Sequence, residues 1–178
     1  MFRDNGSRLA SMTENHLFAL PSDSIAVTSD DCYTPRWVFD AMGLHFDLDV
    51  AAPPGGPWHV PAKRYYTAED DGLSQPWEGL VWCNPPYSEA ERWAAEWAAH
   101  PTGCFMTQVA SRQRWRNWVY RAADAIYIGQ VEFQRPDGTT LKFGWTPISV
   151  AFRGVGTEPA ERLAAADPYG AVLYGRPA

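Results

Sequence analysis

The stretch GLVWCNPPYSEAERWAAEWAAH, residues 79–100, decides the fold. Its first four residues, Gly79–Trp82, form an apolar run typical of a buried strand, and residues 88–100 have apolar side chains at helical spacing. Two consecutive prolines lie between these parts. Because they remove two backbone donors and fix two φ angles, neither a helix nor a central strand can continue through them. The stretch therefore predicts a strand, a rigid loop and a helix. The buried face of that helix is expected to consist of Ala90, Trp93, Ala94 and Trp97.

Strand-like and helix-like segments alternate along the rest of the chain. A helix is predicted with Thr34 as its N-cap, Pro35 at its first position and Gly43 at its end. The other predicted elements are strands at 45–52, 103–110, 125–129 and 147–154, a helix at 111–123 and a hairpin at 131–143. This order predicts a three-layer α/β domain with a mostly parallel sheet and a C-terminal β-hairpin.

One domain accounts for the length and composition of the chain. The 178 residues are 46% hydrophobic and 20% charged, which is enough apolar material for a substantial core. Residues 1–30 contain many breakers and no sustained periodicity, so they are expected to form a flexible arm. The domain itself is expected at 31–155. Residues 156–178, rich in Ala, Gly and Pro, are expected to form a weakly specified tail.

The patterns of cysteine, histidine and charge exclude several classes of protein. Three cysteines and four histidines have no spacing typical of a disulfide framework or a zinc site, so no metal is expected. No apolar run has the length of a membrane span and no signal-peptide core is seen, so a reducing cytoplasm is expected. The net charge of −6 argues against a surface coated for phosphate binding, but it allows a local basic groove.

The loop Asn84-Pro85-Pro86-Tyr87 contains the groups needed to hold a planar aromatic amine. The amide oxygen of Asn84 and the carbonyl of Pro85, which has no N–H of its own, could together accept both hydrogens of an exocyclic amine. Accepting both hydrogens draws the lone pair of the nitrogen out of ring conjugation and makes it a better nucleophile. Tyr87 offers a ring on which a base could stack. A rigid strand-to-helix connector is an equally good interpretation of the loop by itself.

Four ordered motifs favour the binding interpretation. NPPY is similar to the signature loop of DNA amino-methyltransferases, which methylate an exocyclic nitrogen of adenine or cytosine with S-adenosylmethionine. Tyr33–Met42 resembles the segment at the methionine end of the cofactor, Phe46–Ala52 the first cofactor motif, and Glu69–Ser88 the acidic segment before the catalytic strand. An ASRQRW-like segment and a late G-x-x-x-F strand at 129–133 add to this pattern. Residues 33–153 thus resemble the compact phage-type DNA adenine-N6 methyltransferases.

The resemblance implies a Rossmann-like methyltransferase fold and a set of site residues. Catalytic roles on the target base are implied for Asn84, Pro85, Pro86 and Tyr87. Contacts with S-adenosylmethionine are implied for Tyr33, Thr34, Pro35, Asp49, Ala51, Asp71, Leu73 and Asn84. In that set, Asp49 would hold the methionine moiety or its bound water and Asp71 the adenine edge, while Glu69 is the candidate for the ribose. The first cofactor motif departs from the usual Gly-x-Gly turn, since its loop reads AAPPGG here.

A basic stretch is expected to bind double-stranded DNA. Residues 111–121, SRQRWRNWVYR, have four arginines and no acidic residue, with aromatic residues between them. Phosphate contacts explain this pattern better than a solvated helix face does. The expected DNA-binding residues are Ser111, Arg112, Arg114, Trp115, Arg116, Arg135 and Lys142. Arg153 could extend this surface, whereas Trp115 and Trp118 are expected to anchor the helix in the core.

The leading hypothesis is a phage- or prophage-encoded DNA adenine-N6 methyltransferase that acts in the cytoplasm of a bacterial host as a monomer or homodimer. Cytosine-N4 methylation is a second hypothesis, because the loop by itself does not distinguish the two amines. A catalytically silent nucleic-acid-binding module of the same fold is a third, and the short first cofactor motif is the feature that favours it.

Overall fold

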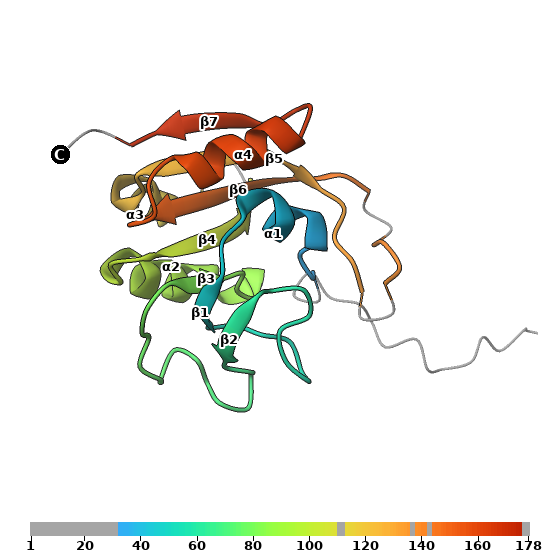
Figure 1. Cartoon of the computed structure of the whole chain (residues 1–178). Helices are drawn as coiled ribbons and strands as arrows, with labels where there is room; N and C mark the ends of the chain where they lie inside the picture. Colours follow the sequence, from blue (N-terminus) through green and yellow to red (C-terminus); the bar gives the residue numbers. More distant parts are fainter. Residues whose placement is uncertain (1–31, 110–112, 136–137, 142–143, 176–178) are drawn as a thin grey trace, which may run out of the picture.

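The computed structural model describes residues 32–109, 113–135, 138–141 and 144–175 (Figure 1). The predicted N-terminal arm, residues 1–30, lies outside the described residues. No helix in the described part of the chain is long and apolar enough to cross a membrane.

Seven strands form one sheet in the order β2-β1-β3-β4-β6-β5-β7 (Figure 1). The strands are β1 Phe46–Asp49, β2 Ala62–Tyr65, β3 Val81–Cys83, β4 Gly103–Gln108, β5 Ala125–Val131, β6 Thr146–Arg153 and β7 Ala171–Tyr174. Strands β2, β1, β3 and β4 are parallel to one another, while β6 is antiparallel to both β4 and β5. Strand β5 therefore runs in the same direction as β4, and only β6 and the edge strand β7 oppose the rest.

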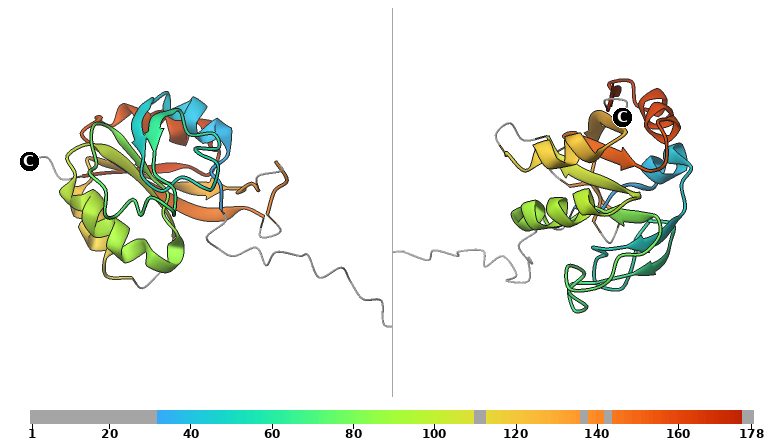
Figure 2. Two further views of the ribbon diagram at one scale, coloured as in Figure 1. Left: turned by 90° about the horizontal axis from the view of Figure 1, so that it is seen from below. Right: turned by 90° about the vertical axis from the view of Figure 1, so that its left-hand side faces the viewer.

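Helices cover both faces of this sheet (Figure 2, right). They are α1 Arg36–Met42, α2 Ala90–Ala99, α3 Arg116–Ala122 and α4 Glu158–Ala166, with a 3-10 turn η1 Tyr87–Glu89 before α2. Helices α1 and α4 pack together on one face, and α2 and α3 pack together on the other. The predicted three-layer, mostly parallel α/β fold is confirmed.

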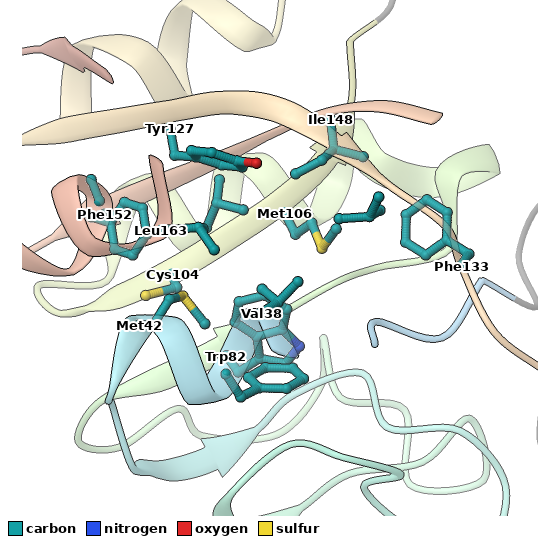
Figure 3. Close-up of a cluster of buried hydrophobic side chains, with 14 of the residues drawn as sticks. Val38, Met42, Trp82, Cys104, Met106, Tyr127, Phe133, Ile148, Phe152 and Leu163 are labelled. Carbon is teal, nitrogen blue, oxygen red and sulfur yellow. The ribbon is translucent and has the colours of Figure 1, made fainter. Parts of the chain in front are cut away.

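Alternate residues of the central strands divide between the two layers, because successive strand side chains point to opposite faces. Trp82 of β3 and Met106 of β4 belong to the cluster under α1 and α4 (Figure 3). Their neighbours Val81, Cys83 and Phe105 belong to the cluster under α2 and α3. The predicted buried face of α2 is confirmed at all of its positions, Ala90, Trp93, Ala94 and Trp97.

Three local features differ from the sequence-based expectations. Helix α1 begins at Arg36, and Thr34 does not cap it because its hydroxyl bonds elsewhere. The edge strand β2 is formed by residues 62–65, most of whose side chains are exposed, so no apolar alternation marks it in the sequence. The expected tail contains α4 and β7. Leu163 of α4 is fully buried against the sheet, so this segment is part of the folded core.

A narrow hairpin connects β5 to β6. Gln134 pairs antiparallel with Thr140 on one side and with Tyr33 on the other. Backbone bonds from Leu141 to Phe133 and from Arg135 to Thr139 close it. Its tip, residues 136–137, lies outside the described residues. The predicted C-terminal hairpin is confirmed, and it packs beside the segment that precedes α1.

Candidate functional site

The carboxyl ends of β1 and β3 form the switch point of the sheet. These strands are neighbours, but the chain leaves β1 toward β2 on one side and β3 toward β4 on the other. Ligands of open α/β sheets bind in the crevice outside such a point. Asp49 ends β1, and Asn84 directly follows β3. The fold thus brings the two polar residues singled out from the sequence to one crevice.

Two adjoining clefts open at this point. The first brings together, from among the sequence-predicted residues, Tyr33, Thr34, Asp49, Ala51, Asn84 and Pro86. The second is lined by Asp71, Gly72 and Trp93, together with Thr67 and Glu89. Both clefts share the walls Ala51, Ala52, Ala68 and Pro86. The two clefts together form a two-part site. Because the residues that they share are small, a ligand can lie across the loop after β1 and occupy both clefts.

The remaining predicted site residues do not line these clefts. Pro35 and Pro85 are buried, and Leu73 packs against the hydrophobic layer under α2. Tyr87 packs edge-on against Phe133 of the hairpin, with ring centroids 6.4 Å apart. Glu69, the candidate for the ribose, is exposed and lines neither cleft.

The side chain of Asn84 is held by its donor end. Its Nδ2 donates to the carbonyl oxygen of Cys32 at 3.0 Å and to Oγ1 of Thr34 at 3.2 Å. Because a backbone carbonyl only accepts hydrogen bonds, this pairing fixes which end of the amide is the nitrogen. Oδ1 is then the free end: it is buried and accepts no hydrogen bond from the described residues. A buried acceptor without a donor costs free energy, so a ligand with an N–H group fits this position.

Asp49 is a buried carboxylate at the other wall of the first cleft. It is 2% exposed and accepts one hydrogen bond, from the backbone N–H of Ala51 at 3.2 Å. No basic side chain pairs with it among the described residues. Burial therefore raises its pKa from 3.8 to about 7, and the Ala51 bond offsets only part of this effect. A cationic ligand would supply the missing partner.

Asp71 lies in a tight turn beside the second cleft. Its φ of 50° makes it the only non-glycine residue with positive φ in the described part of the chain. Its carboxylate accepts a hydrogen bond from the hydroxyl of Ser74, and the next residue, Gly72, packs against the carbonyl of Val50 too closely to allow a Cβ. The turn is thus fitted onto the loop after β1, which keeps Asp71 at the cleft.

A comparison with known families identifies the family to which this chain belongs. A model of the DNA N-6-adenine-methyltransferase (Dam) family matches residues 22–141, which include both clefts and the hairpin. The chain belongs to this family. No curated protein matches it. Membership confirms the resemblance to DNA adenine methyltransferases and makes DNA adenine methylation the general activity of this Dam-family protein, with DNA as its substrate.

Most basic side chains of the described residues already have partners. Ion pairs with carboxylates engage Arg36, Lys63, Arg64, Arg92 and Arg162. Arg153 donates to the backbone carbonyls of Ala98 and His100 at the end of α2, so it is a helix cap and does not extend a basic surface. The remaining arginines in the described part of the chain, which have no acidic partner there, are Arg114, Arg116, Arg121 and Arg135. They lie in or just before α3 and on the hairpin of this Dam-family protein.

The basic stretch differs in detail from its expected form. Arg116 is only 7% exposed, with its guanidinium 5.6 Å from the ring of Trp115, so it does not offer an open phosphate contact. Trp115 is buried, as expected for a core anchor, whereas Trp118 is 45% exposed and is not one. Helix α3 begins only at Arg116, whereas the sequence predicts a helix from residue 111. Ser111, Arg112 and Lys142 lie outside the described residues.

Sequence reasoning missed one wall of the first cleft. Trp58, His59 and Val60 come from the irregular loop after β1 and face the side of the cleft with Tyr33. The rings of Trp58 and Tyr33 lie 6.2 Å apart, and Trp58 is 40% exposed. A tryptophan in a loop rich in proline and glycine is the signal that could have identified it, because no helix or strand pattern there assigns the side chain to the core.

Proposed function

We propose that this protein transfers a methyl group from S-adenosylmethionine to the exocyclic N6 of adenine in double-stranded DNA. The observation that carries this proposal is the amide of Asn84, whose donor end is bound within the protein and whose buried acceptor end lacks a donor among the described residues. Adenine N6 is an amine that can donate to that oxygen. Family membership supports the same substrate.

The two clefts fit S-adenosylmethionine by the chemistry of their walls. The methionine end is cationic, and Asp49 is a buried carboxylate without a cationic partner among the described residues. Tyr33 and Trp58 add aromatic faces, which attract cations. Asp71 in the second cleft would accept from the amino group of the cofactor adenine. When bound, the cofactor supplies the activated methyl group on its sulfonium.

The residues of the chain contribute position more than acid–base chemistry. A methyl transfer from a sulfonium needs donor and acceptor in line, and orientation of this kind supplies a large part of the rate. Asn84, with the carbonyl of Pro85, would hold the target amine with its lone pair toward the first cleft. Tyr87, braced by Phe133, would stack on the extruded adenine.

Arg114 and Arg135 are the proposed phosphate contacts. Strands β3, β4 and β5 run in the same direction, so the segments that follow them begin at the same edge of the sheet. Arg114 follows β4 and Arg135 follows β5, which brings both to the edge that carries Asn84. Arg121 lies in the last turn of α3, where the chain has returned toward the opposite edge. It is therefore a matched control.

The activity is tested in two steps. Calorimetry should first show that the protein binds S-adenosylmethionine. Duplex DNA treated with protein and cofactor is then digested to nucleosides, and mass spectrometry should detect N6-methyladenine. Asn84→Ala should leave cofactor binding nearly intact and methylate no DNA, because it removes the Oδ1 acceptor proposed for the target amine.

Other outcomes of the same experiment identify the alternatives. N4-methylcytosine in the digest would establish the cytosine enzyme instead. Cofactor binding without any methylated base would indicate a silent module. Asp71→Ala should weaken cofactor binding about tenfold or more, as expected for a lost hydrogen bond to a charged group. An unchanged affinity would contradict the proposed position of the adenosine end.

The DNA surface is tested by the salt dependence of binding. The Arg114→Gln, Arg135→Gln double variant should flatten the slope of log K against log salt by about 1.8, or about 0.9 for each lost phosphate contact. Arg121→Gln should leave the slope unchanged. Equal effects of the double variant and the control would refute the assignment of this edge as the DNA surface.

A further inference from the structure

The hydroxyl of Thr34 occupies a defined place in the contacts of Asn84. It donates its proton to Sδ of Met106 at 3.3 Å, and it accepts a hydrogen from Nδ2 of Asn84 at 3.2 Å. Met106 lies within the core (Figure 3), so the donor capacity of the hydroxyl is used inside the core, and its oxygen faces the amide. Thr34 is 5% exposed, so water does not compete for either bond.

The two acceptors of the Asn84 amide come from one short segment. Cys32 supplies its carbonyl oxygen at 3.0 Å, and Thr34 supplies its hydroxyl two residues later. The residue between them, Tyr33, forms both backbone hydrogen bonds of an antiparallel bridge with Gln134, at 3.2 and 3.0 Å. The segment is thus fixed by the hairpin on one side and holds the amide on the other.

We propose that Thr34 is a positioning residue: its hydroxyl fixes the amide of Asn84 so that Oδ1 points to the target amine. This role rests on the proposed function of the site. It differs from a direct contact with the cofactor, which the sequence implies for Thr34. The hydroxyl donates its proton to Met106, so it has none to give to a cofactor, and one of its two lone pairs already accepts from Asn84. An amide with one acceptor removed gains freedom to rotate.

The role predicts a loss of rate without a loss of binding. Thr34→Val keeps the shape of the side chain and removes the hydroxyl, leaving Nδ2 with the carbonyl of Cys32. The single-turnover rate of methyl transfer should fall about three- to tenfold, as expected for one neutral hydrogen bond. The Kd for S-adenosylmethionine and the Kd for DNA should stay within about twofold. Thr34→Ser, which restores the hydroxyl, should recover most of the rate.

The control variant is Thr107→Val. Thr107 is a threonine of β4 that is as buried as Thr34, and its hydroxyl makes one long bond, at 3.5 Å, to the carbonyl of Gln108. It should keep the wild-type rate. An independent measurement uses the side-chain amide of Asn84 in protein labelled with ¹⁵N: its protons should exchange faster with water in Thr34→Val, and at the wild-type rate in Thr107→Val.

Each result decides the matter. A reduced rate with unchanged affinities, recovered by serine, supports the positioning role. A cofactor affinity that falls together with the rate overturns it and assigns Thr34 to the cofactor. A Thr34→Val protein as fast as the wild type also overturns it. A wild-type protein that binds cofactor but methylates no adenine refutes the proposed function itself, and this role with it.

Discussion

Replacing Asp49 by asparagine should make the protein without cofactor more stable at neutral pH, although it should weaken binding of the cofactor. The carboxylate is buried, lacks a cationic partner among the described residues and has its pKa raised to about 7 by desolvation. The folded protein therefore keeps the proton of Asp49 up to about pH 7, while the unfolded chain releases it near 3.8. Between these values the folded state binds more protons, so stability falls as the pH rises.

The magnitude follows from these two values. The difference between 3.8 and about 7 corresponds to roughly 4 kcal/mol of lost stability once the pH is above 7. The Asp49→Asn variant would keep the bond from Ala51 but bury an amide N–H₂ without an acceptor, at a cost of about 1–3 kcal/mol. The net gain at pH 8 should be about 1–3 kcal/mol. At pH 5 the raised pKa of Asp49 has lowered the stability of the wild type by only about 1.6 kcal/mol. This is close to the cost of the buried amide in Asp49→Asn, so the stability difference between the two proteins should approach zero.

The assay is urea unfolding of both proteins without cofactor at pH 5 and pH 8. Asp47→Asn is the control, because Asp47 lies on the same strand but is paired with Lys63 at 2.8 Å, and its pKa is lowered by that bond. Its removal should decrease stability by a similar amount at pH 5 and pH 8, because both values lie above the ordinary pKa of 3.8 and the lowered pKa of Asp47 keeps it ionised at both. Equal stability of Asp49→Asn and the wild type at pH 8, or a difference that does not shrink toward pH 5, would refute the reasoning.

Three other predictions concern the site. The affinity for S-adenosylmethionine, measured by calorimetry, should be about tenfold weaker at pH 6 than at pH 8, because only about a tenth of Asp49 is ionised at pH 6. The Asp49→Asn variant is the control: any pH dependence that it retains comes from titration of the cofactor itself. Asn84→Asp should lower both thermal stability and methylation, because a carboxylate cannot donate to the carbonyl of Cys32. Full methylation activity of this variant at pH 8 would contradict the prediction. Fluorescence anisotropy should show that Tyr87→Ala weakens binding of DNA by about 1–3 kcal/mol, while Tyr87→Phe has little effect. A severe defect in the phenylalanine variant would assign the role of Tyr87 to its hydroxyl.

Local sequence patterns predict much of the fold. The apolar run before Asn84, the prolines after it and the helical spacing of Trp93 and Trp97 predict β3, its loop and α2, because each pattern involves neighbours in the chain. Strand β2 could not be found in this way, because its side chains are mostly exposed. Helix α4 does have a local helical pattern, with Pro159 in its first turn and Leu163 on its buried face, but the segment is rich in Ala, Gly and Pro, a composition that favours a tail.

The sequence by itself determined the family, the order of the elements from α1 to β6 apart from β2, and the residue types of the candidate site, since these depend on motifs that are contiguous in the chain. Tertiary structure alone decided how those residues are used. It brought Thr34 and Asn84, far apart in the chain, within 3.2 Å, and this orients the amide. It buried Arg116 and paired Arg153 with carbonyls, and it left Asp49 without a cation among the described residues. Hydrogen bonding and desolvation depend on neighbours in space, and a sequence specifies such neighbours only through the complete fold.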